Sequence, residues 1–155
     1  MKCVLVLDNI RSVYNVGAIF RTAEAIGVEK IYLCGITPGP LDRFGRARKD
    51  FHKSALGAEE NVSWERIESV KEMIQDLRFK IYEWVALEQD ERAMNYKDYK
   101  LVKDFALVLG QEVEGIGKDV LDLCDKIIEI PMRGRKESLN VSVAAGVALF
   151  SLLDQ

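Results

Sequence analysis

The chain has 155 residues, of which 48% are hydrophobic and 30% charged. This composition is typical of one compact globular domain. Lys and Arg number 22 against 25 Asp and Glu, which gives a net charge of −3. No global positive field therefore attracts nucleic acid, and a site for a polyanion has to be local.

The supply of metal ligands and reactive thiols is small. The chain has a single histidine, His52, and three widely spaced cysteines with no C-x-x-C pair. This excludes a zinc site of the usual His/Cys kind and predicts reduced, buried thiols in a cytosolic protein. With no acid or nucleophile predicted nearby, His52 is expected in a surface loop rather than in a catalytic triad.

Membrane and secretory segments are not expected. The longest apolar stretch, Val143 to Leu153, is too short to span a bilayer, and the apolar run at the N-terminus is too short for a secretory signal. These features predict a soluble, cytoplasmic protein.

Short apolar runs rich in Val, Ile and Leu alternate with helical patterns. The runs predict strands at Cys3–Leu7, Lys30–Cys34, Lys80–Leu87, Phe105–Leu109 and Lys126–Ile130. Their near-continuous apolarity favours a parallel sheet covered on both faces. Helices are predicted at Val16–Ile26, with Asn15 as N-cap and Gly27 as its stop, at Ile67–Leu77 and at Lys118–Cys124. The fold class is therefore an α/β single-domain sandwich with right-handed crossovers.

The last predicted helix, Ser138–Leu153, is apolar nearly all round. Leu139, Val143, Val147 and Phe150 lie on one side, and alanines with Leu152 lie on the other. Such a helix has to be buried on both sides. A partner subunit is the simplest cover for the outer side, and another helix of the same chain is the alternative.

Glycine- or asparagine-bearing segments follow three of the predicted strands: Asn9–Arg21, Leu109–Gly117 and Ile130–Ser142. Ligands of open α/β sheets bind beyond the carboxyl ends of the strands. None of the segments is G-x-G-x-x-G or G-x-x-x-x-G-K-[ST], which argues against a Rossmann dinucleotide site and a P-loop.

Basic residues are concentrated locally. Arg21 falls on the polar side of its predicted helix, free for a site or simply solvated. Asp42–Lys53 carries five basic and two acidic residues, a net +3. With Phe44 and Phe51 interleaved, a mobile loop of this kind fits phosphate contacts and base stacking, although a solvated charge run is the alternative. The segment Ile130–Ser142 adds Arg133, Arg135 and Lys136 as a second basic patch.

Taken together, three motifs resemble the SpoU (TrmH-type) family of RNA ribose 2′-O-methyltransferases of the SPOUT superfamily. Asn15 to Ala23 is similar to its N-x-G-x-x-x-R-T-A motif, and Leu107 to Gly115 to its strand-G-x-E-x-x-G motif. Ile130 to Ser142 matches I-P-M-x-G-x-x-x-S-L-N-V-S. The three occur in the family's order and span nearly the whole chain.

The resemblance implies a C-terminal deep trefoil knot, a feature that sequence patterns alone would exclude because knots are almost absent from proteins. It implies that S-adenosylmethionine binds in the knotted crevice, leaves as S-adenosylhomocysteine, and needs no metal. It also implies a homodimer packed through the last helix. Residues 1–155 are expected to form one methyltransferase domain without an N-terminal RNA-binding extension, acting on tRNA or rRNA.

The resemblance also implies roles for particular residues. Arg21 would act on the 2′-hydroxyl as base or electrostatic activator, with Glu112 as its charged partner, while further polar groups would orient them. The expected catalytic residues are Arg21, Asn15, Glu112, Ser138 and Asn140. The expected cofactor-binding residues are Leu109, Gly110, Ile130, Met132, Ser138 and Leu139. The expected RNA-binding residues are Arg11, Arg43, Arg46, Arg48, Lys49, Arg135 and Lys136.

Two alternatives to these catalytic roles remain open from the sequence. Ser138 and Asn140 are residue types that commonly cap the N-terminus of a helix, and this role can coexist with catalysis. The protein as a whole could be a non-catalytic RNA-binding or assembly module that keeps the same fold. The presence of Asn15, Arg21 and Glu112 together argues against that, because such a module has no need of them.

Overall fold

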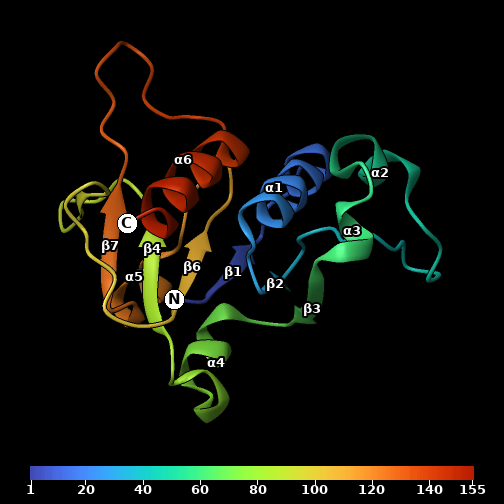
Figure 1. Ribbon diagram of the computed structural model, residues 1–155, viewed down its shortest axis with the longest axis horizontal. Coiled ribbons are helices and arrows are strands. Elements are labelled where there is room, and N and C mark those ends of the chain that lie inside the picture. The colour runs from blue at the N-terminus through green and yellow to red at the C-terminus, as the bar shows by residue number, and fades with distance from the viewer.

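A computed structural model describes residues 1–155 and contains one seven-stranded sheet in the order β3-β2-β1-β6-β4-β7-β5 (Figure 1). Every pairing in it is parallel. The strands are β1 Cys3–Asp8, β2 Lys30–Cys34, β3 Ser63–Ile67, β4 Glu83–Leu87, β5 Met94–Asn95, β6 Phe105–Leu109 and β7 Lys126–Glu129. The predicted parallel α/β sandwich is confirmed, and four of the five predicted strands match within one or two residues at each end.

Helices cover both faces of the sheet. One layer contains α1 Val13–Ile26, α2 Lys49–Ala55, α3 Ala58–Asn61 and α6 Val141–Leu153, and the other contains α4 Val70–Gln75, the 3-10 helix η1 Leu77–Phe79 and α5 Lys118–Leu123. Figure 1 shows α6, α1 and α2 side by side along one side of the sheet and α4 on the other. Each layer seals its own apolar core, so the central strands are buried on both faces.

Helix α1 begins earlier than predicted. Its N-cap is Ser12, whose hydroxyl accepts a hydrogen bond from the Asn15 backbone N–H, so the prediction of Asn15 as N-cap is wrong. Asn15 lies inside the first turn, where its side chain is free to bind elsewhere. The predicted stop is confirmed, because Gly27 takes the left-handed conformation with φ 82° that a C-cap requires.

Strand β3 was missed because tertiary packing, and not apolar periodicity, holds it. Strand β3 contains Ser, Trp, Glu and Arg and lies at the sheet edge, and it ends at Ile67, where a helix was predicted to begin. That helix is α4, which starts at Val70 after the Ser69 cap. Strand β4 is likewise shorter than predicted, since the chain before Glu83 forms turns.

The segment predicted as a mobile basic loop is partly helical. Helix α2 occupies Lys49–Ala55 and buries Phe51 against Phe20 of α1, with ring centroids 5.0 Å apart. The prediction that Phe51 is available for base stacking is therefore wrong. His52 lies on this helix and not in a loop, with its Nδ1 atom 2.6 Å from a Glu59 carboxylate oxygen.

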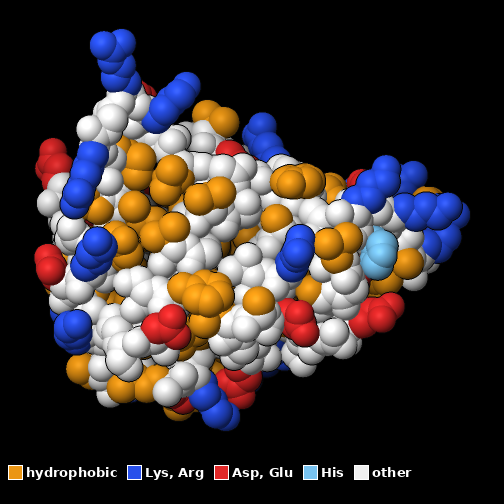
Figure 2. All heavy atoms as spheres, turned by 45° about the horizontal axis from the view of Figure 1, so that its top comes forward, with side chains coloured by type: hydrophobic (Ala, Val, Ile, Leu, Met, Phe, Trp, Pro, Cys, Tyr) orange, Lys and Arg blue, Asp and Glu red, His pale blue; other side chains and the backbone are white.

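Helix α6 has two faces with different surroundings. Its N-cap is Asn140, and its Ala145, Ala148, Leu149 and Leu152 are completely buried against α1 and the sheet. The opposite side is exposed. This outer face of α6 consists of Val143, Val147 and Phe150, and Leu139 extends it just before the helix; the four side chains are between 36% and 51% exposed. Figure 2 shows hydrophobic side chains gathered over this region. The chain itself covers one face and leaves the other open.

The three cysteines lie in or next to the apolar core. Cys3 and Cys34 are buried and Cys124 is half-buried, all as free thiols. Burial raises the pKa of the Cys34 and Cys124 thiols to about 12. No helix combines the length and the hydrophobicity that crossing a bilayer requires.

The Thr37 hydroxyl ties the ends of β1 and β2 together, and we expect its loss to destabilise the fold. It accepts a hydrogen bond from the Ile10 N–H and lies 3.0 Å and 2.8 Å from the carbonyl oxygens of Leu7 and Cys34. Thr37→Val keeps the shape but leaves a buried N–H unpaired, so urea denaturation should show a loss of roughly 1–3 kcal/mol. Thr37→Ser, which keeps the hydroxyl, is the control. Equal stability of the two variants would contradict this account.

Candidate active site

A cavity of about 380 Å³ opens beyond the carboxyl ends of β4, β6 and β7. Its walls are drawn from residues 87–89, 109–115, 129–132 and 137–144. Both its volume and its position are those of a small-molecule site in an open parallel sheet. We call it the carboxyl-edge cavity.

All six residues expected to bind a cofactor line this cavity. They come from three parts of the chain, the end of β6, the end of β7 and the approach to α6. The six are Leu109, Gly110, Ile130, Met132, Ser138 and Leu139. The loop after β6 and the segment between β7 and α6, which are the two segments expected to bind the cofactor, thus meet at one place.

Gly110 has to be glycine because the chain folds back on it. A Cβ atom placed there would lie 2.6 Å from the carbonyl carbon of Gly115 and 2.6 Å from the backbone nitrogen of Ile116. Gly115 itself has φ 68°, which side-chain-bearing residues rarely adopt. The loop after β6 is therefore a tight turn whose backbone forms one wall of the cavity.

The cavity is lined by acidic but not by basic side chains. Five glutamates contribute to it, and no Lys, Arg or His does. The five are Glu88, Glu112, Glu114, Glu129 and Glu137. Such a lining disfavours ligands with several phosphates and favours one that carries positive charge.

Glu88 and Gln89 belong to the cavity although the sequence analysis did not single them out. Glu88 accepts hydrogen bonds from the backbone N–H groups of Ile116 at 2.8 Å and Gln89 at 3.0 Å, and so holds the loop after β6 in place. The Gln89 amide donates to the backbone oxygen of Glu137 at 2.7 Å. Their position directly after a predicted strand was the signal that could have identified them.

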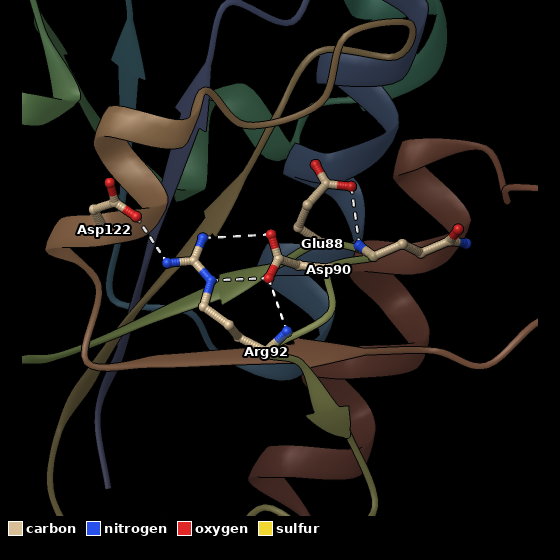
Figure 3. Close-up of polar contacts among 5 residues, drawn as sticks. Glu88, Asp90, Arg92 and Asp122 are labelled. Carbon is tan, nitrogen blue, oxygen red and sulfur yellow. Dashed lines mark hydrogen bonds and ion pairs between the residues drawn. The ribbon is translucent and has the colours of Figure 1, made fainter.

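An arginine anchors the turn that carries Glu88. Arg92 contacts Asp90 at 2.9 Å and Asp122 of α5 at 2.7 Å. Figure 3 shows its guanidinium between the two carboxylates, with Glu88 outside this ion-pair cluster. Because Arg92 is engaged by Asp90 and Asp122 and makes no ion pair with Glu88, the Glu88 carboxylate is left to the loop and the cavity.

Three of the predicted catalytic residues form one hydrogen-bonded chain. The buried Asn15 amide donates to a carboxylate oxygen of Glu112 at 3.2 Å, and its oxygen accepts from the Asn140 amide at 3.1 Å. Glu112 also accepts from the backbone N–H groups of Arg11 and Ser12, each at 3.3 Å. The chain thereby joins the start of α1, the loop after β6 and the N-terminus of α6.

The protonation of Glu112 follows from this environment. Burial by itself raises the pKa of the carboxyl group, but hydrogen bonds from the Asn15 side chain and from nearby backbone N–H groups outweigh it. The net result is a pKa below the ordinary value of 4.5. Glu112 is therefore charged at neutral pH, and this charge stabilises the junction.

Arg21 and Ser138 are not brought together by the chain. Ser138 lines the carboxyl-edge cavity, whereas Arg21 lies exposed on α1 in a separate hollow. We call it the Arg21 hollow. It is lined by Tyr14, Ala18, Arg21, Thr22, Ala25, Lys53, Ser54 and Phe150. Arg21 makes no ion pair with Glu112, so that expectation is wrong: Glu112 is occupied by Asn15 and the backbone of Arg11 and Ser12.

Comparison with known proteins decides the family. The model of the SpoU rRNA Methylase family matches residues 2–150. The chain belongs to the SpoU family. It is 36% identical over 152 residues to the 23S rRNA (guanosine-2′-O-)-methyltransferase RlmB of Haemophilus influenzae. That match covers 98% of this chain and 59% of the relative, so the chain spans about three fifths of the curated relatives it matches.

Solved structures superpose on nearly the whole chain. An AdoMet-bound rRNA methyltransferase from Sinorhizobium meliloti has a TM-score of 0.86 and 26% identity, covering 97% of this chain and 55% of that one. The A. aeolicus TrmH/SpoU tRNA modifying enzyme has a TM-score of 0.85 and 27% identity, covering 99% and 75%. The parallel sheet described above is therefore the SpoU fold.

The residues expected to bind RNA lie on three parts of this SpoU protein. Arg11 is in the loop between β1 and α1, and Arg135 and Lys136 are exposed on the loop 130–140, which projects from the body in Figure 1. The remaining four precede or begin α2, at the end of the molecule where Figure 2 shows Lys and Arg gathered. These are Arg43, Arg46, Arg48 and Lys49.

Among the side chains of the chain, no cluster of three His, Cys, Asp or Glu has the arrangement of a metal site.

We expect Glu112→Gln to loosen the Asn15–Glu112–Asn140 junction of this SpoU protein in a pH-dependent way. A pKa lowered on folding stabilises the native state above the unfolded value, and this contribution is lost as pH falls through the lowered pKa. Chemical denaturation at pH 7 should therefore show the variant to be less stable than the wild type. The difference should shrink as the pH falls below the ordinary value of 4.5. Curves that stay parallel down to pH 3 would contradict this role.

Proposed function

We propose that this SpoU protein transfers the methyl group of S-adenosylmethionine to a ribose 2′-hydroxyl of tRNA or rRNA. The observation that carries the proposal is the carboxyl-edge cavity, which brings two of the family motifs together in an acidic lining without a basic side chain. Support comes from the similarity to RlmB and to an AdoMet-bound rRNA methyltransferase.

The cavity fits the proposed cofactor in shape and charge. Leu109, Ile130, Met132 and Leu139 supply apolar walls, and the turn at Gly110 supplies backbone groups at close range. When bound, the sulfonium supplies an activated methyl group, and its positive charge is matched by the surrounding glutamates. The protein's part is to hold the cofactor in one orientation and to exclude water.

In this proposal the polar residues divide into two groups. Arg21 faces the RNA and activates the ribose hydroxyl together with a neighbouring phosphate, a role suited to a permanently charged guanidinium. Asn15, Glu112 and Asn140 act as positioning residues, because they bind one another and hold three segments at the cavity. Ser138 is exposed at the cavity wall, where its hydroxyl is free to bind the cofactor or the ribose.

RNA contacts are proposed at Arg11, at Arg135 and Lys136, and at the four basic residues beside α2. None of these basic side chains lines the acidic cavity, although Arg135 and Lys136 lie on the loop that forms part of its wall, so phosphates and cofactor bind to groups of opposite charge. The competing proposal, a non-catalytic RNA-binding module, shares these contacts. It does not account for a preformed acidic cavity that phosphates would avoid.

A homodimer through the outer face of α6 is also proposed. This face leaves Val143 51% and Phe150 45% exposed on a helix whose other face is buried. Contiguous exposed apolar side chains of this kind mark interaction surfaces. Phe150 also lines the Arg21 hollow, so a copy docked on α6 would come next to Arg21.

A single methyltransferase domain over residues 1–155 and a C-terminal deep trefoil knot complete the proposal. The knot is supported by the strand order, because β4 lies between β6 and β7, which both follow it in the chain. The Gln155 side chain donates to the Tyr99 carbonyl oxygen, which places the end of the chain against the segment between β5 and β6. A C-terminus that threads through a loop has to lie close to that loop, and this contact with the segment between β5 and β6 meets the condition.

The function is tested by methyl transfer from radiolabelled S-adenosylmethionine to total tRNA and rRNA, followed by mapping of 2′-O-methylated positions. Arg21→Ala should retain cofactor affinity by calorimetry, because Arg21 lies outside the carboxyl-edge cavity. Its single-turnover transfer should fall by roughly 10² or more, the scale of losing one positioned catalytic group. Arg21→Lys should not restore it.

Two results would count against the proposal in different ways. Absence of measurable S-adenosylmethionine binding at millimolar concentration would overturn the enzyme reading. Transfer by Arg21→Ala at the wild-type rate would instead assign the activation of the hydroxyl to another group.

We expect Val147→Glu to separate the proposed dimer into monomers. The side chain lies on the outer face of α6 and is 36% exposed, so a charge there meets solvent in a monomer but would be buried unpaired in a dimer. Sedimentation should show a dimer for the wild type and a folded monomer for the variant. Lys71→Glu, an exposed substitution on α4, is the control. A wild type that is monomeric at micromolar concentration would refute the interface.

A further inference from the structure

A small exposed hairpin before α2, residues 41–47, is held in shape by its own contacts. Leu41 and Ala47 form an antiparallel bridge, and Gly45 takes φ 76° at the turn. The Asp42 carboxylate accepts hydrogen bonds from the backbone N–H groups of Phe44 at 2.8 Å and Arg46 at 3.0 Å. The turn is therefore preformed and holds its tip residues in a fixed direction.

The tip of this hairpin presents an aromatic ring close to two guanidinium groups. Phe44 is 66% exposed. The guanidinium carbons of Arg43 and Arg46 lie 4.8 Å and 5.1 Å from its ring centroid. Both guanidinium groups lie over the ring, yet Phe44 stays 66% exposed, so part of its surface is accessible to another flat group.

The charges around Phe44 leave cations available for phosphate. Arg46 is paired with Asp42 at 3.1 Å and Arg48 with Asp50 at 2.8 Å. Arg43 makes no ion pair, and neither does Lys49 or Lys53. An exposed aromatic ring beside unpaired cations is the combination that binds single-stranded nucleic acid, in which bases stack and the backbone needs neutralising.

A continuous surface connects this hairpin to Arg21. The Arg21 hollow contains Lys53, and Lys53 also lines a second hollow together with Lys49 and Arg48. Lys49 and Arg48 line a third hollow that reaches Arg43 on the hairpin. One strand of RNA can thus follow shared basic residues from Arg21 to Phe44.

We propose that Phe44 stacks on an unpaired base of the RNA substrate while Arg43 and Lys49 contact the neighbouring phosphates. The inference rests on the proposed function for the identity of the ligand, and it adds that the substrate is single-stranded beyond the target nucleotide. A continuous duplex keeps its bases stacked inside and offers none to Phe44. The hairpin therefore selects RNA loops or ends over helical stems.

The test measures binding rather than catalysis. Phe44→Trp places a fluorescent ring at the tip, and an unstructured RNA 12-mer should quench its emission beyond the quenching seen in the wild type, which has Trp64 and Trp84. The same 12-mer in a duplex should not. Phe44→Leu should weaken binding of the single strand by roughly tenfold, within the range for losing one stacked base. It should leave binding of inorganic polyphosphate unchanged.

Leu77→Ala is the matched control, because Leu77 is also an exposed apolar side chain but lies on η1, in the opposite helix layer. Equal single-strand affinity of Phe44→Leu and wild type would overturn the proposal. A change in sedimentation of Phe44→Leu without a change in RNA affinity would also overturn it, and would assign the ring to a contact between proteins. Quenching without methyl transfer would support the stacking site while the enzymatic proposal fails. If Phe44→Leu transferred methyl groups at the wild-type rate and bound the single strand with wild-type affinity, the enzymatic proposal would stand and the stacking site would be overturned.

Discussion

The pairing of β6 with β1 on one side and β4 on the other is the interaction on which the remaining structure depends. Phe105 to Leu109 is completely apolar, and each residue of β6 stands opposite one residue of β1 and one of β4. Because both faces of this strand are buried, helices have to cover both sides of the sheet. Because all pairs are parallel, the carboxyl ends of the strands open at one edge. The loops after β6 and β7 and the start of α1 consequently converge there.

The sequence was most informative where burial on both faces produces an uninterrupted apolar run. The predicted strands at β1, β2 and β6 agree with the structure for that reason. It was least informative at β3 and α2, whose amphipathic signal is short or masked by charge. Phe51 illustrates the limit: its neighbours are charged, yet contact with Phe20 determines that it is buried. No property of the local sequence reports that contact.

The site shows a similar division. The resemblance to the family placed six residues at the cavity because they lie in loops whose ends are fixed by strands. It did not identify the partner of Glu112, since that depends on the entry of α1 and on which side chain reaches first. Asn15 lies inside the first turn and points at the carboxylate, whereas Arg21 is almost two helical turns further along. Glu88 was overlooked because it belongs to no motif and acts through hydrogen bonds to a neighbouring loop.

The overall charge of −3 conceals a separation of charge between two regions. The cavity is lined by glutamates, while basic residues lie around α2 and on the loop 130–140. A cationic small molecule and a polyanion are therefore attracted to different places and do not compete for the same groups. Local arrangement of charge, and not its sum, determines what such a protein attracts.

The hydrogen bond between Gln89 and Glu137 has a consequence for access to the carboxyl-edge cavity. It is the one hydrogen bond that holds residues 131–139, which otherwise extend from β7 to α6 without secondary structure. A single bond of this kind contributes only about 1 kcal/mol. Displacement of the segment thus leaves the sheet and both helix layers intact. One wall of the carboxyl-edge cavity can therefore move without unfolding of the domain.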